Sequence, residues 1–217
     1  MGRIDELDYV NPEIKIAFDI DGCCVDTMGV VKDLLDKKYG IRMGDPKTFN
    51  VCEEKEIPPA VFWFCVRLAI RMWDTLPIYP GVIDLFRRLH EGTGSYIQFI
   101  TGRSVTQAEE TFKLCRRMCG RIPFQVAFVD TRRSSKAVFM RGYEYIYEDR
   151  RKTACDILLA GYKVVMPKRS YNDPTYAKER YFPLYVSWIS KLDQSPENNF
   201  LYDVTPVDLL DQVDTFI

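Results

Sequence analysis

Short apolar runs recur along the chain and predict the strands of a buried sheet. The first run covers Ile14 to Ile20 and stops at Asp21-Gly22. Runs of this length and character, bounded by turn residues, are typical of strands that are buried on both faces. The pattern predicts five strands in all, the later ones at Tyr96–Ile100, Phe124–Val129, Tyr143–Tyr147 and Lys163–Met166.

Helical spacing of apolar residues appears between these strands. It covers Val82–Leu89, Val105–Met118 and Thr153–Ala160. Strands that alternate with helices are typical of a parallel, doubly wound sheet. The chain is therefore expected to have an α/β fold.

The segment Thr27 to Pro80 breaks this alternation, because it has helical patterns and no clear strand. Its expected helices are Met28–Tyr39 and Pro58–Trp73, the second of which starts at a proline pair. The aromatic residues on the second helix are more often core than a ligand platform. The segment is interpreted as an insertion between the first strand and the next βα unit.

The end of the chain carries two weaker patterns. Thr205-Pro206 followed by Asp208 predicts the start of a terminal helix, and Asp193 to Asn199 has the composition of a polar surface loop.

Composition limits the class of protein. The chain has 217 residues, of which 47% are hydrophobic and 28% charged, so we expect one globular domain with a modest insertion. The formal net charge of −1 gives no field that would hold a nucleic acid or an anionic membrane over a wide surface. Any preference for phosphate must therefore be local.

Targeting signals and metal-binding cysteine pairs are not evident. Met1 to Asn11 is acidic without an apolar core, which favours a cytoplasmic protein, and Ala60 to Ile70 is too short for a membrane span. The seven cysteines include no C-x-x-C pair, so they are interpreted as reduced thiols rather than as a zinc site.

Three large enzyme classes lose support: those with a catalytic triad, those with a phosphate loop and those that bind a dinucleotide. His90 is the only histidine, and its place near the end of a predicted helix fits a helix-terminal cation better than a catalytic triad. There is no phosphate loop with a GK[ST] signature, and Gly92-Thr93-Gly94 precedes a predicted strand where a dinucleotide fingerprint would follow one.

Aspartates at the end of the first strand carry the clearest chemical signal. Asp19 and Asp21 are two positions apart, so their side chains leave the strand on the same side. The carboxyl ends of strands are where open α/β sheets place ligands, and Gly22 permits a sharp turn there. Asp-Gly is also a common turn pair, but a turn does not explain a carboxylate at the end of an apolar strand.

Polar residues at other strand ends add to this signal. Thr101-Gly102-Arg103 links the second strand to a helix and could hold an anion, although Thr and Ser also cap helices. Glu148-Asp149-Arg150 follows the fourth strand, either as a helix cap or as oxygen ligands for Mg²⁺. Lys136 lies between the third and fourth strands and could neutralise a transferring group, although a lone lysine is usually at the surface.

Taken together, these residues resemble the four ordered motifs of the haloacid dehalogenase superfamily of phosphatases. The motifs span Ile14 to about Met166 and consist of Asp19-Ile20-Asp21-Gly22, Thr101-Gly102-Arg103, Lys136 and Glu148-Asp149. The resemblance implies a Rossmann-like three-layer α/β/α core with a five-stranded parallel sheet and a small helical cap after the first strand. The core would comprise residues 12–27 and 81–217, and the cap residues 28–80.

The resemblance also implies a role for each residue. Asp19 would be the nucleophile that forms an aspartyl-phosphate, and Asp21 the general acid and base. Mg²⁺ would be held by Asp19, by the backbone carbonyl of Asp21 and by Asp149, with Glu148 and Arg150 outside this shell. Residues implied in phosphate binding are Thr101, Gly102, Arg103 and Lys136.

Within the superfamily the chain is most similar to the 5′(3′)-deoxyribonucleotidases. The supporting residues are Asp26, Leu76–Gly81, Arg150 and Arg169–Asn172, while Cys23-Cys24 depart from the aliphatic pair usual after the first motif. The implied substrate is a deoxynucleoside monophosphate. Whether the protein forms a homodimer is left open by the sequence.

Three alternatives remain: a phosphatase for the 3′ end of a polynucleotide, one for a sugar phosphate or another small metabolite, and a non-catalytic binding module of the same fold. The net charge argues mildly against the first, and retention of all the acids argues against the last.

Overall fold

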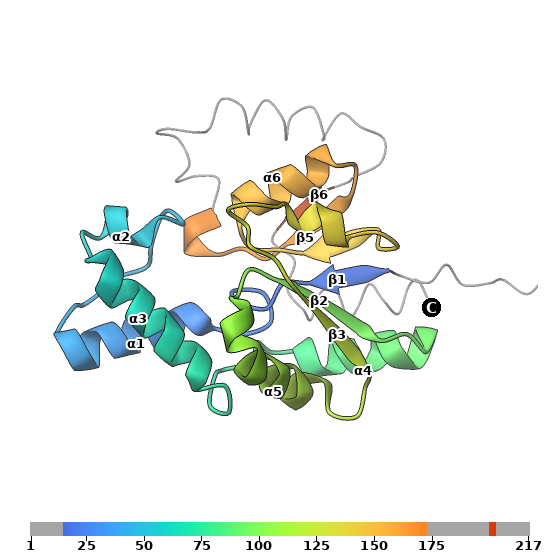
Figure 1. Ribbon diagram of the computed structural model, residues 1–217, viewed down its shortest axis with the longest axis horizontal. Helices are drawn as coiled ribbons and strands as arrows, with labels where there is room; N and C mark the ends of the chain where they lie inside the picture. The colour runs from blue at the N-terminus through green and yellow to red at the C-terminus, as the bar shows by residue number, and fades with distance from the viewer. Residues whose placement is uncertain (1–14, 173–199, 203–217) are drawn as a thin grey trace, which may run out of the picture.

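A parallel sheet forms the centre of the protein. The computed structural model describes residues 15–172 and 200–202, and the six strands found there lie in the order β3-β2-β1-β4-β5-β6 (Figure 1). All neighbouring pairs are parallel. The strands are β1 (Ile16–Phe18), β2 (Ile97–Thr101), β3 (Phe124–Phe128), β4 (Tyr145–Tyr147), β5 (Lys163–Met166) and β6 (Phe200–Tyr202).

Both faces of the sheet are buried, because successive strand residues point to opposite sides. In β1, Phe18 packs into one apolar cluster and Ala17 into the other, and Phe99 and Ile100 of β2 divide in the same way. This explains why the strands appear in the sequence as continuous apolar runs rather than as alternating ones.

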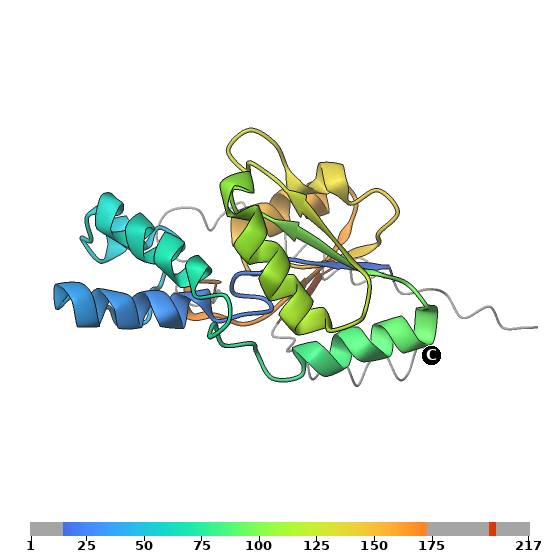
Figure 2. The same ribbon diagram turned by 60° about the horizontal axis from the view of Figure 1, so that its bottom comes forward.

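Helices cover both faces (Figures 1 and 2). On one face, α4 (Val82–Thr93) and α5 (Ala108–Cys119) contribute residues such as Phe86 and Leu114 to the cluster around Phe18. On the other face, α6 (Arg151–Leu159) contributes Ile157 to the cluster around Ala17. The resulting three-layer α/β/α fold is the one expected.

The inserted segment forms helices α1 (Thr27–Tyr39), α2 (Val51–Glu54) and α3 (Pro59–Arg71). They lie beyond the carboxyl ends of the strands in both views (Figures 1 and 2). A separate apolar cluster, which includes Leu35 and Cys65, joins them. Asp26 begins α1 by accepting a hydrogen bond from the Gly29 N–H at 2.8 Å.

The aromatic residues of α3 divide between core and surface. Phe62 is buried, whereas Trp63 is 51% and Phe64 45% exposed. The interpretation of this stripe as core therefore holds for Phe62 and is wrong for its two neighbours. Periodicity explains the split, because three consecutive residues cannot all face one side of a helix.

The five predicted strands and the helices around them are confirmed, with ends that differ by a few residues. The short elements β6 and α2 were not predicted. The segments Met1–Asn11 and Asp193–Asn199 and the helix after Thr205 lie outside the described residues. The core and cap boundaries remain a prediction.

Among residues 15–172 and 200–202, no helix is both long and apolar enough to cross a bilayer. All seven cysteines carry free thiols, and five of them are buried, in agreement with the interpretation as reduced thiols.

Candidate active site

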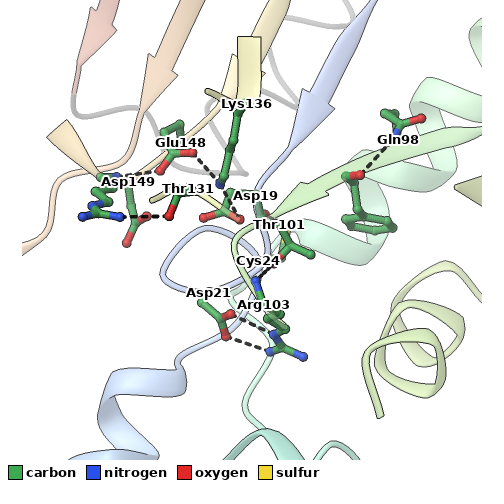
Figure 3. Close-up of polar contacts among 12 residues, drawn as sticks. Asp19, Asp21, Cys24, Gln98, Thr101, Arg103, Thr131, Lys136, Glu148 and Asp149 are labelled. Atoms are coloured by element: carbon green, nitrogen blue, oxygen red, sulfur yellow. Dashed lines mark hydrogen bonds and ion pairs between the residues drawn. The ribbon is translucent and has the colours of Figure 1, made fainter. Parts of the chain in front are cut away.

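The polar residues gather where the direction of strand order reverses, between β1 and β4. Asp19 directly follows β1, and its N–H donates to the Tyr147 carbonyl at 2.8 Å, which fixes it beside the end of β4. Glu148 and Asp149 follow β4. Because both strands end at the same edge, side chains 129 or more residues apart in the chain meet there, at the position where open α/β sheets bind ligands (Figure 3).

Lys136 bridges two of these carboxylates. It begins the 3₁₀-helix η2 (Lys136–Phe139), which Ser135 caps by accepting the Ala137 N–H at 3.2 Å. Its Nζ lies 2.8 Å from Asp19 Oδ1 and 2.7 Å from Glu148 Oε2 (Figure 3). Glu148 Oε1 also accepts the Arg150 N–H at 2.9 Å, so Glu148 positions both the lysine and the start of α6.

The charges of this cluster are not balanced by the protein. Burial raises the pKa of Asp19 to about 7, although Lys136 lowers it, and Glu148 adds to the rise. Burial and the charges of Glu148 and Asp19 raise the pKa of Asp149 well above its ordinary value. Burial would lower the pKa of Lys136, but the two carboxylates beside it raise it, so the lysine is a fixed cation.

Asp149 is held by the segment after β5. The Tyr171 hydroxyl donates a short hydrogen bond to Asp149 Oδ2, and the Asn172 side chain donates to the Asp149 carbonyl at 2.9 Å. Gly22 passes directly beneath this carboxylate: a Cβ at Gly22 would lie 1.9 Å from Asp149 Oδ2, and its φ of 77° is left-handed. Glycine is therefore required here for two independent reasons.

A set of ligand atoms suited to a cation lies between the two strands. One ligand atom from each of Asp19, Cys23 and Asp149 lies within 4.8 Å of the others, and all three residues are buried. Carboxylate oxygens are the ligands that Mg²⁺ prefers, and the single lysine of the cluster cannot balance the charges of Asp19, Glu148 and Asp149 together. The residues present therefore fit a divalent cation, with a thiol as an additional neighbour.

Asp21 has a different environment. Arg103 donates to both of its carboxylate oxygens, from Nε at 2.8 Å and from Nη2 at 2.7 Å, and the Thr27 hydroxyl adds a short hydrogen bond (Figure 3). Burial alone would raise the pKa of Asp21, but Arg103 and Thr27 together hold it below its ordinary value. The structure thus brings the carboxylates of Asp19 and Asp149 together and directs that of Asp21 to Arg103.

The residues after β2 are arranged as follows. Thr101 is fully buried, and its hydroxyl accepts the Arg103 N–H at 3.2 Å. Gly102 is exposed at the turn, and Ser104 caps a short 3₁₀-helix, η1 (Val105–Gln107), that leads into α5. The Arg103 side chain is engaged with Asp21, so its implied role in phosphate binding remains a prediction.

The inserted segment reaches the site through Phe49. The Arg150 guanidinium lies 4.5 Å from the centre of the Phe49 ring, and the Tyr171 ring centre is 5.8 Å away. Phe49 is 47% exposed, so part of its ring remains open beside the site. On the other side, Arg169 lies over the Tyr79 ring at 4.1 Å and donates to the Gly22 carbonyl at 2.8 Å.

Three of these residues were not singled out as site residues from the sequence. Cys23 was interpreted as a reduced thiol and, with Cys24, as a departure from the aliphatic pair usual after the first motif, although its position directly after Gly22 places it near Asp19. Tyr171 lies inside the segment Arg169–Asn172 noted for its resemblance, which was a usable signal. Nothing in the sequence around Phe49 indicates a contact with Arg150.

Comparison of the sequence with protein-family models and with curated proteins finds no match. Solved structures do match. A haloacid dehalogenase-like hydrolase from Streptococcus pneumoniae is 16% identical, with a TM-score of 0.52 over 92% of this chain and 98% of that one. A Thermotoga maritima protein assigned as a beta-phosphoglucomutase is 14% identical, with a TM-score of 0.55 over 93% of this chain and 99% of that one.

A third structure, a Lactobacillus plantarum protein assigned as a phosphoglycolate phosphatase, is 13% identical, with a TM-score of 0.53 over 92% of this chain and 98% of that one. The chain therefore has the fold of the haloacid dehalogenase-like hydrolases. At these identities the likeness establishes the fold alone.

Proposed function

We propose that this chain is a magnesium-dependent phosphomonoester hydrolase that works through an aspartyl-phosphate on Asp19. The observation that carries the proposal is the meeting of Asp19, Lys136 and Asp149 at the carboxyl edge of the sheet, within a fold shared with haloacid dehalogenase-like hydrolases. A buried carboxylate beside one fixed cation and one further buried carboxylate is costly unless the arrangement binds a charged ligand.

The residues divide the chemistry as follows. An Asp19 oxygen attacks phosphorus while the bond from phosphorus to the ester oxygen breaks, and Asp21 gives its proton to the departing oxygen. A water oxygen then attacks phosphorus, its proton passes to Asp21, and the bond between phosphorus and Asp19 breaks to release phosphate. Lys136 and the Gly102 N–H stabilise the charge on the phosphoryl oxygens, and Thr101 supports this turn.

Asp21 must change partners to serve as an acid, because Arg103 holds it as a carboxylate. Its side chain is 32% exposed, so a substrate can reach it. Glu148 acts through Lys136 and is a positioning residue.

Mg²⁺ would be held by the carboxylates of Asp19 and Asp149 and by the Asp21 carbonyl. When bound, it would neutralise charge between the nucleophile and the phosphate. The protein's part is to keep both carboxylates buried and fixed, through Lys136 on one and Tyr171 on the other.

The proposed substrate is a deoxynucleoside monophosphate, and the activity a 5′(3′)-deoxyribonucleotidase. The half-exposed Phe49 ring beside Arg150 supports this choice, because an aromatic face next to a cation suits a planar base near a phosphate. The runner-up is a sugar phosphate or similar metabolite, which the names of two structural neighbours favour.

A phosphate-release panel tests the proposal. It compares ribo- and deoxynucleoside 5′- and 3′-monophosphates, sugar phosphates, phosphoglycolate and a 3′-phosphorylated oligonucleotide, each with magnesium and with chelator. We expect magnesium-dependent release that is fastest from a deoxynucleoside monophosphate. Release from none of these compounds would overturn the proposed activity, and fastest release from a sugar phosphate would select the runner-up.

A further inference from the structure

A second polar pocket adjoins the candidate active site. It is lined by Thr131, Ser134, Ser135, Lys136, Arg150, Lys152, Thr153 and Asp156. Lys136 belongs to both regions, since its ammonium contacts Asp19 and Glu148. Thr131 also lies close to the active-site loop, because its Cγ2 would be 3.5 Å from a Cβ at Gly102. A molecule bound at Asp19 would therefore have this pocket beside it.

The composition of the pocket favours an anion. Its lining offers four hydroxyl groups and the cations of Arg150 and Lys152 against the single carboxylate of Asp156, and its third cation, Lys136, is already paired with Asp19 and Glu148. Arg150 donates to the Thr131 hydroxyl at 3.5 Å, which turns the guanidinium toward the pocket wall. The nearby Arg132 and Arg133 do not add to this count, because Asp130 pairs with both.

The first turn of α6 closes one side of the pocket. Arg150, Lys152 and Thr153 come from this turn, and the N-cap residue Arg150 makes no side-chain capping bond. The N–H groups at the start of a helix, together with the helix dipole, attract anions. An anion-attracting N-terminus is common to many helices, so it does not by itself indicate a binding site.

Two side chains make the pocket a specific site. Thr153 is only 6% exposed, lines the pocket, and its hydroxyl makes no hydrogen bond with any residue in the described ranges. A polar side chain that lines a pocket without a protein partner is available to a ligand or to an ordered water. Lys152 is an exposed lining cation that likewise forms no ion pair within residues 15–172 and 200–202.

We propose that this pocket binds a second phosphate group of the substrate, while the scissile phosphate is at Asp19. The inference rests on the proposed function and extends its substrates from deoxynucleoside monophosphates to compounds with a second phosphate group, such as a deoxynucleoside 3′,5′-bisphosphate. Lys152, Arg150 and the N–H groups of α6 supply the charge and the donors, and the Thr153 and Ser134 hydroxyls complete the shell.

The test compares a deoxynucleoside 3′,5′-bisphosphate with the matching monophosphate, through the ratio of their kcat/KM values. We expect the wild-type protein to favour the bisphosphate about tenfold, as one charge-assisted contact gives. Lys152→Gln and the near-isosteric Thr153→Val should each lower that ratio at least about threefold. The control Lys113→Gln, an exposed lysine on α5, should leave the ratio unchanged.

A wild-type ratio near one, or a ratio that neither variant alters, would overturn the proposal that the pocket binds a second phosphate group. The proposed phosphatase activity would remain intact. Absence of turnover with both compounds would instead count against the proposed function. In that case calorimetric titration with the bisphosphate still tests whether the pocket binds a phosphate group. The affinity of the protein for the bisphosphate should fall in Lys152→Gln and stay at the wild-type value in Lys113→Gln. Equal affinity in the two variants would sink the proposal.

Discussion

Asp19 and Asp21 are two residues apart on the same loop and have opposite surroundings. Asp19 shares one lysine with Glu148 and lies within reach of Asp149, so three buried carboxylates gather near a single cation that pairs with only two of them. Asp21 accepts two hydrogen bonds from the Arg103 guanidinium and one from the Thr27 hydroxyl. The Asp19 side therefore carries uncompensated negative charge, whereas the Asp21 side is balanced by the protein.

The contrast shows how one fold gives two adjacent carboxylates different tasks. The pKa of Asp19 is raised to about 7 by burial, and a bound cation would offset this cost. The pKa of Asp21 is lowered by Arg103 against the effect of burial, so it stays ionised until a substrate displaces that contact. We infer that metal binding belongs to the first side and proton transfer to the second.

The largest effect should come from removing the nucleophile. Asp19→Asn keeps the size of the side chain, and turnover should fall by several orders of magnitude because the amide cannot form the acyl phosphate. Initial rates in saturating magnesium measure this. The control is Asp84→Asn, which removes an exposed acid paired with Arg87 on α4. An Asp19→Asn protein with wild-type rates would end the mechanism.

Asp21→Asn should cost less, by about 10² to 10⁴ in rate, as expected for general acid and base help. The loss should be smaller for an aryl phosphate, whose leaving group needs little protonation, than for a nucleotide. Rates with both compounds, measured side by side, separate this role from a structural one. An equal loss with both would argue against proton donation.

Magnesium should stabilise the protein more at high pH than at low pH. The pKa of Asp19 in the fold, about 7, exceeds its ordinary value of 3.8, so the folded state binds more protons than the unfolded state between those values. Stability therefore falls as the pH rises through this window, and Asp149 acts in the same direction. A cation needs both carboxylates ionised, so it competes with protons at low pH.

Thermal unfolding with magnesium and with chelator checks this at about pH 5 and about pH 8. At saturation the rise in Tm should be about 5 to 10 °C at the higher pH and close to zero at the lower. Equal shifts at both pH values would show that the cation does not bind at these carboxylates.

The smallest expected effect concerns the preference among metals. Cys23 places a sulfur atom near the two carboxylates, and thiolates favour soft cations. Cys23→Ser should weaken Cd²⁺ binding about tenfold and leave Mg²⁺ binding nearly unchanged. The ultraviolet charge-transfer band from thiolate to cadmium should be absent in Cys23→Ser.

The matched control is Cys24→Ser, because Cys24 is equally buried but its thiol donates to the Asp19 carbonyl at 3.1 Å. Persistence of the ultraviolet band in Cys23→Ser, or its loss in Cys24→Ser alone, would contradict the placement of the sulfur.

The sequence allowed much of the fold to be predicted, since buried parallel strands produce continuous apolar runs and helices between them show clear periodicity. The apolar run at β6 is only Phe200–Tyr202, whereas the runs that predicted β1 and β4 extend beyond those strands. The helix α2 has only four residues, so neither β6 nor α2 gives a usable pattern. The acids Asp19 and Asp149 could be predicted to meet because strand ends share one edge of the sheet.

The partner of each acid could not be predicted. Arg103 is 82 residues from Asp21 and lies in the turn after β2. Tyr171 is 22 residues from Asp149 and approaches it because Asn172 fixes that segment. Such pairings depend on rotamers and loop paths that local sequence does not specify.

The most direct test is calorimetric titration of Mn²⁺, as a substitute for Mg²⁺, into the wild-type protein, Asp149→Asn and Asp21→Asn. We expect one bound ion in the wild-type protein, affinity at least about tenfold weaker in Asp149→Asn, and near wild-type affinity in Asp21→Asn, whose backbone carbonyl is unchanged. Unaltered binding in Asp149→Asn, with loss in Asp21→Asn, would contradict the division between the two sides.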